Sequence, residues 1–289
     1  MSKLNIARAF SYYVRMTNVI PHFNNVQILA DDHRPNLAWL FLNRPDKANA
    51  LSYDHLHDIE QAALYFRETD VFQVVILAGR GKHFSAGADL SEGQTTTPAD
   101  KPPSMVLRRR RMRIGQRAIE ALLSVDQITV AAWQGAAMGG GACLTTACDF
   151  RVGAANCFMQ YPEIDLGINL MWKSLPLIVN LVGPARAKRL VVGSERLEAA
   201  TLLDWGILDE LVDPSDLLPA ATRMADRYLA KPPMAAQMIK QSVNQYANAL
   251  NHAIMHMDVD QNLLNTLTED RRIAATTYQT DKPRTFSGD

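Results

Sequence analysis

Three consecutive glycines, at positions 139–141, constrain the fold of this chain more than any other feature. They follow an apolar, strand-like segment at residues 128–133 and open an apolar helical pattern that ends near Cys148. Glycines have no Cβ atom, and the first amides of a helix have no intrahelical acceptor, so such a turn can hold an anionic oxygen. The motif therefore predicts a strand, a tight turn and a helix with an anion site between them.

Composition limits the class of protein. The chain has 289 residues, 47% hydrophobic and 21% charged, which is enough to bury one large core or two modest ones. Lys plus Arg equals Asp plus Glu at 30 each, so no overall field would attract nucleic acid or an anionic membrane. No apolar run is long enough to span a bilayer. Cys143, Cys148 and Cys157 lie in apolar segments, as is typical of reduced thiols in an intracellular protein.

The N-terminus has a composition of its own. The first 30 residues contain Lys3, Arg8 and Arg15 but no Asp or Glu. This is the composition of an organelle transit peptide, although serine is sparse, and a bacterial N-terminal extension or a start at Met16 would also fit. We interpret residues 1–25 as an extension outside the fold. We expect a cytoplasmic protein, with the mitochondrial matrix as the alternative if the extension is a transit peptide.

Strand and helix patterns alternate from residue 26 to about residue 160, where the sheet is expected to end. From residue 170 onward nearly every pattern is helical. We therefore predict an α/β core at residues 26–195 and a helical C-terminal region at residues 196–289, which completes the fold and an oligomer. The predicted strands lie at 26–29, 37–42, 74–77, 128–132, 149–152 and 157–159. The predicted helices lie at 53–66, 105–123, 170–182, 185–192, 197–205 and 218–250, the last with a break at Pro232-Pro233.

Five short motifs occur in order along the chain: LNRPDKANAL (42–51), FSAGADL (84–90), MGGG (138–141), CDFR (148–151) and PEIDLG (162–167). Together they resemble the signature blocks of the crotonase (enoyl-CoA hydratase/isomerase) family, and the resemblance covers residues 26–246. It implies an α/β fold of the ClpP/crotonase type, with stacked ββα units and a helical C-terminal region. It also implies a homotrimer or dimer of trimers that acts on an acyl-CoA. No cofactor is implied, because coenzyme A is part of the substrate.

The resemblance implies where the acyl-CoA would bind. The thioester oxygen would lie between the backbone amides of Ala88 and Gly140, which stabilise the enolate formed when a proton is removed beside the carbonyl. A dinucleotide site is excluded, because residues 135–141 lack the Gly-x-Gly-x-x-Gly spacing and no acidic residue follows at the usual interval. The residues expected to bind the CoA moiety are Lys47, Ala48, Ala86, Asp89 and Leu90.

The catalytic base is expected in the Pro-Glu block. Enoyl-CoA hydratases use two glutamates, and the matching positions here are Cys143 and Glu163, so one carboxylate is missing. The acid of the dienoyl-CoA isomerases falls on Met171 and is missing too. Glu163 alone resembles the base of the 3-enoyl to 2-enoyl-CoA isomerases, which takes a proton from carbon 2 and returns it at carbon 4. That shuttle needs a dry pocket, to which Met171 and Trp172 would contribute.

Other interpretations stay open. Hydroxycinnamoyl-CoA hydratase-lyases of the same family add water with a single glutamate, so hydration is the second interpretation. Cys143 could attack a thioester, but no histidine can be placed beside it, and a small apolar filler is the simpler interpretation. A polar loop at 91–103 is followed by a run of arginines, at 108–111 and Arg113. Most of these arginines would face solvent, and one or two could contact CoA. The same run would also fit an RNA-binding family member, and a non-catalytic member is a further alternative. No histidine pattern has the form of a metal site.

Overall fold

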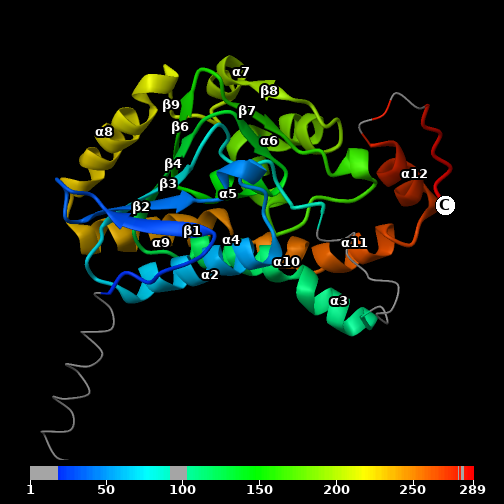
Figure 1. The fold of residues 1–289 in the computed structure, drawn as a ribbon, viewed down its shortest axis with the longest axis horizontal. Coiled ribbons are helices and arrows are strands. Elements are labelled where there is room, and N and C mark those ends of the chain that lie inside the picture. The colour runs from blue at the N-terminus through cyan, green and yellow to red at the C-terminus, as the bar shows by residue number, and fades with distance from the viewer. Residues whose placement is uncertain (1–18, 92–102, 279, 281–282) are drawn as a thin grey trace, which may run out of the picture.

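The computed structural model describes residues 19–91, 103–278, 280 and 283–289. Most of the predicted N-terminal extension, residues 1–18, and most of the predicted polar loop, residues 92–102, lie outside the described residues. Two sheets and the helices packed around them form the fold in Figure 1. The α/β class predicted from the sequence is therefore confirmed.

The larger sheet has six strands in the order β1-β2-β3-β4-β6-β9. The pair β1 and β2 is antiparallel, and every other neighbouring pair is parallel. The predicted strand pair thus forms one edge of the sheet, coloured blue in Figure 1. The strands are β1 (Val26–Ala30), β2 (Leu37–Leu42), β3 (Val74–Gly79), β4 (Ile128–Trp133), β6 (Phe150–Ala154) and β9 (Glu210–Val212).

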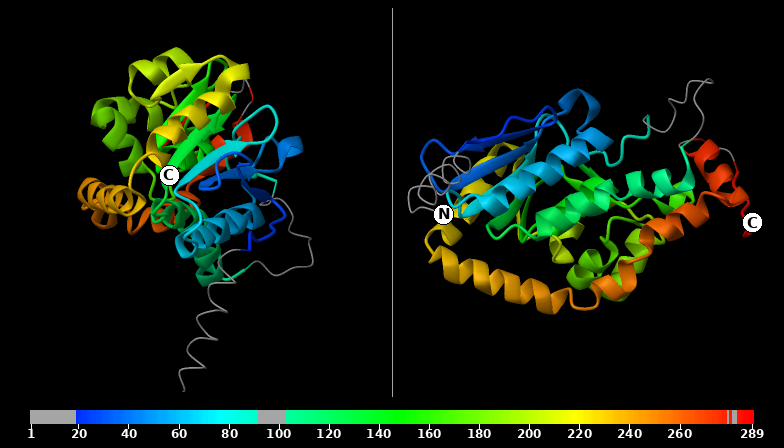
Figure 2. Two further views of the ribbon diagram at one scale, coloured as in Figure 1. Left: turned by 90° about the vertical axis from the view of Figure 1, so that its left-hand side faces the viewer. Right: turned by 90° about the horizontal axis from the view of Figure 1, so that it is seen from below.

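Helices cover both faces of this sheet, as the two views of Figure 2 show. Every residue of β3 and of β4 is buried, which explains why both strands are apolar throughout. Successive side chains of β3 enter different cores, with Val75 and Leu77 on one face and Val74 and Ile76 on the other. The first face is covered by α2 (Tyr53–Glu68) and α4 (Ile114–Leu123), and the second by α8 (Leu217–Leu229).

A smaller sheet carries the glycine turn. Its strands pair in the order β5 (Ala136–Met138), β7 (Phe158–Gln160) and β8 (Leu197–Glu198). Helix α5 (Gly140–Ala147) begins just after β5, so the predicted turn contains a short strand of its own. The expectation that the sheet ends near residue 160 is wrong, because β8 and β9 come later in the chain. Strands of two or three residues are too short to give a periodic signal.

Two predicted helices begin or break elsewhere. The predicted helix at 105–123 is two helices, α3 (Met105–Met112) and α4, with Arg113 between them. Helix α6 (Leu175–Val191) begins at Leu175 rather than at residue 170. The cause lies in Trp172 and Lys173, whose φ angles of 66° and 56° are incompatible with a right-handed helix.

The remaining helices follow α7 (Ala199–Asp204) and α8 along one side of the molecule, coloured yellow to red in Figure 2. Near the C-terminus, α11 contacts α3, and α12 packs against the short turn η2 (Ile164–Leu166). None of the described helices has the length and apolar character needed to cross a membrane. The last helices are α9 (Pro233–Ala247), α10 (Asn251–Met255), α11 (Asp258–Asn265) and α12 (Glu269–Thr277).

Candidate active site

The glycine turn brings two backbone segments together. Gly139 lies between β5 and α5 with a φ of 48°, and its N–H donates a hydrogen bond to the carbonyl of Gln160 at 2.9 Å. The N–H of Met138 donates to the carbonyl of Ser85 at 3.0 Å. A Cβ atom on Gly141 would lie 2.7 Å from that same carbonyl oxygen. The close approach of the turn to the Ser85 carbonyl therefore requires glycine at position 141, and this contact fixes the turn against the segment of Ser85.

The segment around Gly87 presents a second set of backbone amides. Gly87 has a φ of 86°, and its carbonyl accepts a hydrogen bond from the N–H of Leu51 at 2.8 Å. A Cβ atom on Gly87 would lie 2.6 Å from the carbonyl oxygen of Met138. Among the described residues, no acceptor pairs with the amide N–H of Ala88 or with that of Gly140. These two amides can therefore donate to an oxygen of a bound ligand.

Both amides belong to residues that line a cavity of about 250 Å³. Glu163 is the one acidic residue in the described part of its lining, and most other lining residues are apolar. The structure thus brings together most of the predicted site residues, which are Ala86, Ala88, Leu90, Gly140, Cys143, Glu163, Met171 and Trp172. The other described residues of the lining are Gly87, Met138, Gly139, Pro162, Leu166, Ile168, Leu170 and Tyr278.

Glu163 precedes η2, and its carboxylate contacts the glycine turn. A Cβ atom on Gly139 would lie 2.7 Å from Oε1 of Glu163, so this glycine makes room for the carboxylate. The other oxygen, Oε2, is inaccessible to solvent and has no hydrogen-bond partner among the described residues. Burial raises the pKa of Glu163 from its ordinary value of 4.5 to about 7, because apolar surroundings disfavour the charged form. Such a carboxyl group can take up and release protons near neutral pH.

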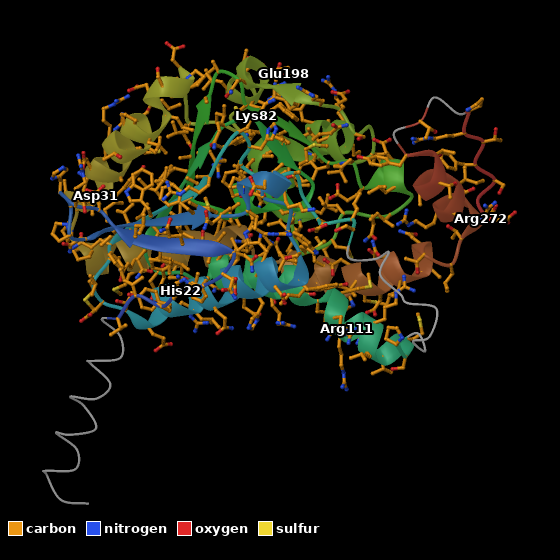
Figure 3. All side chains as sticks on the ribbon, in the orientation of Figure 1. His22, Asp31, Lys82, Arg111, Glu198 and Arg272 are labelled. Carbon is orange, nitrogen blue, oxygen red and sulfur yellow. The ribbon has the colours of Figure 1, made fainter. Side chains whose placement is uncertain are left out.

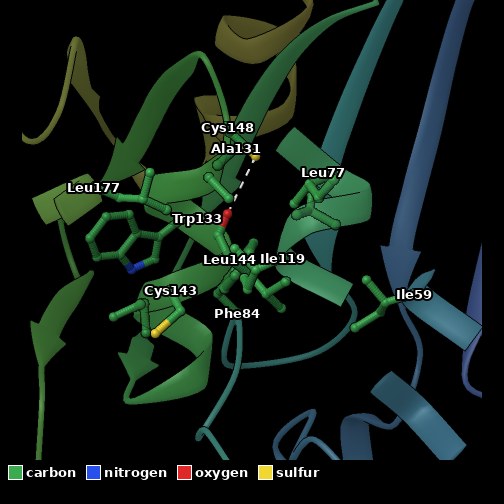
Figure 4. Packing of buried hydrophobic residues seen from close by; sticks show 14 of the residues in the cluster. Ile59, Leu77, Phe84, Ile119, Ala131, Trp133, Cys143, Leu144, Cys148 and Leu177 are labelled. Atoms are coloured by element: carbon green, nitrogen blue, oxygen red, sulfur yellow. Dashed lines mark hydrogen bonds between the residues drawn. The ribbon is translucent and has the colours of Figure 1, made fainter. Parts of the chain in front are cut away.

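Cys143 lies on α5 in the packed core shown in Figure 4, a cluster that also includes Phe84 and Leu144. Its side chain is 1% exposed. Burial is the main cause that raises the pKa of this thiol, and the negative charge of Glu163 adds to it. A neutral thiol is a poor nucleophile, so the geometry favours an apolar filler over a nucleophilic cysteine.

Three of the predicted CoA-binding residues lie outside the cavity lining. Lys47 is exposed at the end of the short turn η1 (Pro45–Lys47), and Ala48 follows it with a φ of 49°. The carboxylate of Asp89 accepts hydrogen bonds from the guanidinium of Arg44 at 3.1 Å. Asp89 therefore has a structural partner within the chain, whereas Lys47 faces solvent.

The predicted arginine run lies on α3. Arg109 pairs with Asp260 of α11 through two hydrogen bonds, which joins α3 to the C-terminal region. Arg108, Arg110 and Arg111 are exposed, and Arg111 points away from the molecule in Figure 3. Most of the run therefore faces solvent, as expected for consecutive residues that cover every side of a helix.

Sequence reasoning expected the C-terminal helices to form pocket walls but did not identify the residues by which the last helix contributes to the site. Tyr278, the residue after α12, lines the cavity. Arg271 of α12 donates a hydrogen bond to the carbonyl of Leu166, and a Cβ atom on Gly167 would lie 2.9 Å from Cα of Arg271. Helix α12 thus packs on the turn that follows Glu163. No local pattern could indicate this contact, since its partners are 105 positions apart.

Comparison with known proteins gives consistent results. A model of the enoyl-CoA hydratase/isomerase family matches residues 32–287. The crotonyl-CoA hydratase of Syntrophomonas wolfei is 29% identical over 86% of this chain and 94% of that protein. An enoyl-CoA hydratase structure from Mycobacterium avium subsp. paratuberculosis K-10 has a TM-score of 0.79 over 92% of this chain and 100% of its own, and at 22% identity it shares the fold. A monofunctional enoyl-CoA isomerase of M. smegmatis has a TM-score of 0.65 and 26% identity over 80% of this chain and 98% of its own.

Proposed function

Because the chain belongs to the enoyl-CoA hydratase/isomerase family, we propose that it converts 3-enoyl-CoA to 2-enoyl-CoA with one catalytic carboxylate. The observation that carries this proposal is that Glu163 has no second acidic residue beside it in the described lining of the cavity. Burial raises the pKa of Glu163 to about 7. An isomerase needs a single group that takes a proton from one carbon and returns it to another. The similarity to the enoyl-CoA isomerase of M. smegmatis supports the same reaction class.

In the proposed reaction, Glu163 removes a proton from carbon 2 of the 3-enoyl thioester. The electron pair of the broken C–H bond forms a double bond between carbons 1 and 2, and the π electrons of the thioester carbonyl move onto its oxygen, which gives a dienolate. The N–H groups of Ala88 and Gly140 donate hydrogen bonds to that oxygen, and each stabilises the charge by about 3 to 4 kcal/mol. Glu163 then returns the proton to carbon 4, which leaves the double bond between carbons 2 and 3. The reaction needs no cofactor beyond the CoA of the substrate.

Hydration of a 2-enoyl-CoA is the second candidate, and the name of the S. wolfei relative favours it. In that reaction Glu163 would take a proton from a water molecule, whose oxygen bonds to carbon 3, and would then return that proton to carbon 2. By the resemblance of its motif, Cys143 stands at the sequence position of the second hydratase glutamate, and burial raises the pKa of its thiol. We expect Cys143→Glu to create or raise hydratase activity, and a folded variant without any gain would contradict this interpretation of Cys143.

The two candidates are separated by incubating the protein with 2-enoyl-CoA and with 3-enoyl-CoA in deuterated water. An isomerase interconverts the two thioesters and exchanges deuterium into them, whereas a hydratase forms 3-hydroxyacyl-CoA. Liquid chromatography separates the isomeric 2-enoyl and 3-enoyl thioesters. Mass spectrometry of the separated thioesters then measures their deuterium content and the amount of 3-hydroxyacyl-CoA. Formation of 3-hydroxyacyl-CoA as the main product would overturn the isomerase proposal in favour of hydration. Neither product, despite tight CoA binding, would exclude both candidates.

The proposal includes assembly into a homotrimer or a dimer of trimers, supported by the exposed surface of α9. Large apolar side chains there have exposed fractions between 58% and 89%. A second cavity, of about 650 Å³ and with many apolar lining residues, lies between α9 and the core. Continuous apolar surface on a folded chain is typical of a protein interface, and identical chains are the commonest partners. The exposed residues are Met234, Met238, Ile239, Val243 and Tyr246, of which Ile239 and Val243 also line this second cavity.

Light scattering after size-exclusion chromatography tests this assembly. The double variant Ile239→Glu and Val243→Glu places charges in the apolar second cavity, at exposed positions of α9, and is expected to give a smaller species than the wild type. Gln245→Glu adds a charge at an exposed polar position of the same helix and serves as the control. A wild-type protein that is monomeric at micromolar concentration would contradict the assembly.

A further inference from the structure

The indole of Trp172 is wedged between two helices beside the cavity. Trp172 is 8% exposed and lines the cavity together with Glu163. A Cβ atom on Gly140, the first residue of α5, would lie 2.1 Å from Cζ3 of the indole. A Cβ atom on Gly115 of α4 would lie 2.0 Å from Cε2 of the same ring. A methyl group at either position would overlap the ring, so the indole fills the space between α4 and α5 without a gap at these two contacts.

The turn that carries this ring is held from several sides. Trp172 and Lys173 both have left-handed φ angles, of 66° and 56°, which non-glycine residues rarely adopt. The N–H of Lys173 donates a hydrogen bond to the carboxylate of Asp258 at 2.8 Å. The ammonium group of Lys173 pairs with Glu120 of α4. Contacts from α4 and α11 thus fix the backbone of the turn, and the ring forms a rigid wall.

We propose that Trp172 is a specificity-determining residue that restricts the protein to short-chain acyl-CoA thioesters. The inference rests on the proposed function, because it places the acyl chain in the cavity of Glu163. That cavity has a volume of about 250 Å³, below the roughly 300 to 1,000 Å³ of most ligand sites. The ring occupies the space between α4 and α5 into which a longer chain would extend. A tightly packed, fixed indole cannot move aside to admit further methylene groups.

The affinity of saturated acyl-CoA thioesters tests the inference without any turnover. Each methylene group that enters an apolar cavity strengthens binding by about fourfold, and one that stays in water adds nothing. For the wild-type protein we expect the affinity to rise from acetyl-CoA to butyryl-CoA. We expect no further rise from hexanoyl-CoA to decanoyl-CoA. Isothermal titration calorimetry measures the whole series.

The break in this series is the chain length at which the affinity stops rising. Truncation of the Trp172 ring should move the break to longer chains. In Trp172→Ala, octanoyl-CoA should bind at least about tenfold more tightly than butyryl-CoA, because the space between α4 and α5 becomes available to the chain. Trp172→Phe keeps a smaller ring and should shift the break by less, and it serves the same purpose if the alanine variant does not fold. Trp39→Ala removes an indole from β2, outside the cavity, and should leave the order of affinities unchanged.

Two results would overturn the inference while leaving the proposed function intact. The first is a wild-type affinity that keeps rising through decanoyl-CoA. The second is a break at the same chain length in the wild type and in both folded Trp172 variants. A failure of every acyl-CoA to bind would instead overturn the proposed function, and the inference with it. A break that moves in the order wild type, Trp172→Phe, Trp172→Ala supports Trp172 as the limit.

Discussion

The cavity has two walls of different construction. The glycine wall, residues 86–88 and 138–140, consists largely of backbone atoms whose positions are set by hydrogen bonds between neighbouring segments. The C-terminal wall, residues 170–172 and Tyr278, consists of side chains held in place from α11 and α12. Glu163 lies between them, because its carboxylate contacts Gly139 and the turn after it is packed under α12.

The difference indicates a division of tasks. Backbone amides bind an oxygen whatever the rest of the substrate is, so the glycine wall suits the charge that every thioester would develop during the reaction. Side chains differ in size and shape, so the C-terminal wall suits the acyl group, in which substrates differ. Changes in the glycine wall should therefore lower kcat for every acyl-CoA. Changes in the C-terminal wall should alter stability and substrate preference.

The largest effect is expected at Glu163, which lies between the two walls. Glu163→Gln keeps the shape of the side chain but removes its ability to accept a proton. We expect kcat to fall by about 10²- to 10⁴-fold, while the affinity for a saturated acyl-CoA stays within about twofold. Steady-state kinetics and calorimetry measure the two quantities. Full activity of the variant on every enoyl-CoA tested would contradict the assignment of Glu163 as the catalytic base.

The raised pKa of Glu163 also predicts how pH acts on the protein. Only the ionised carboxylate accepts a proton, so kcat/KM should fall about tenfold per unit as the pH drops below about 7, and level off above it. Because the folded-state pKa lies above the ordinary value of 4.5, the folded chain binds more protons than the unfolded chain between these values. This group should therefore lower the free energy of unfolding as the pH rises from 4.5 through about 7.

Urea unfolding near pH 5 and near pH 8 measures this linkage. The decline in the free energy of unfolding should be smaller in Glu163→Gln than in the wild type, because glutamine does not titrate. Equal declines in the two proteins would mean that the folded-state pKa of Glu163 is not raised.

The second-largest effect is expected at Gly139 and tests whether this position of the glycine wall must be a glycine. Gly139→Ala forces a side chain onto a residue with a φ of 48° and places a Cβ atom 2.7 Å from Oε1 of Glu163. We expect kcat to fall by about 10²-fold, because the carboxylate must move away from its position beside Gly139. The free energy of unfolding should fall by about 1 to 3 kcal/mol.

Gly206→Ala is the matched control for this change. Gly206 also has a positive φ, of 73°, but a Cβ atom there would meet nothing within 4 Å. The control should lose stability through the backbone alone and keep its kcat. If both variants lost stability equally and both kept kcat, the contact between Gly139 and Glu163 would have no part in catalysis.

The third effect concerns the C-terminal wall. Asp258→Ala removes the acceptor of the Lys173 N–H and leaves that amide without its partner. The free energy of unfolding should fall by about 1 to 3 kcal/mol, whereas kcat should change by less than about tenfold. Asp260→Ala, on the same helix, removes a surface ion pair with Arg109 and should cost less. A larger loss of kcat in Asp258→Ala than in Gly139→Ala would reverse the division between the walls.

The sequence predicted the glycine wall better than the C-terminal wall, and the reason is the range of the interactions. Gly139 and Gly140 belong to a strand, turn and helix whose pattern is local, so an anion site at this turn could be predicted from a few residues. The pairing of the Gly140 amide with that of Ala88 was implied only by the resemblance to the crotonase family. The contact of Lys173 with Asp258 spans 85 positions and leaves no local pattern. The left-handed backbone at Trp172 runs against local preference, which is why the predicted helix began too early.

The smallest effect is expected at Cys143, on the glycine side of the cavity. Cys143→Ala removes one buried sulfur atom, which should lower the free energy of unfolding by about 1 kcal/mol and change kcat by less than about threefold. Because burial raises the pKa of the thiol, iodoacetamide at pH 8 should leave the activity of the folded wild type unchanged. Rapid inactivation that CoA prevents and that Cys143→Ala abolishes would instead identify a reactive thiol in the site. Cys143, which follows the glycine wall on α5, would then supply a nucleophile beside the two amides, and an enolate mechanism based on Glu163 alone would fail.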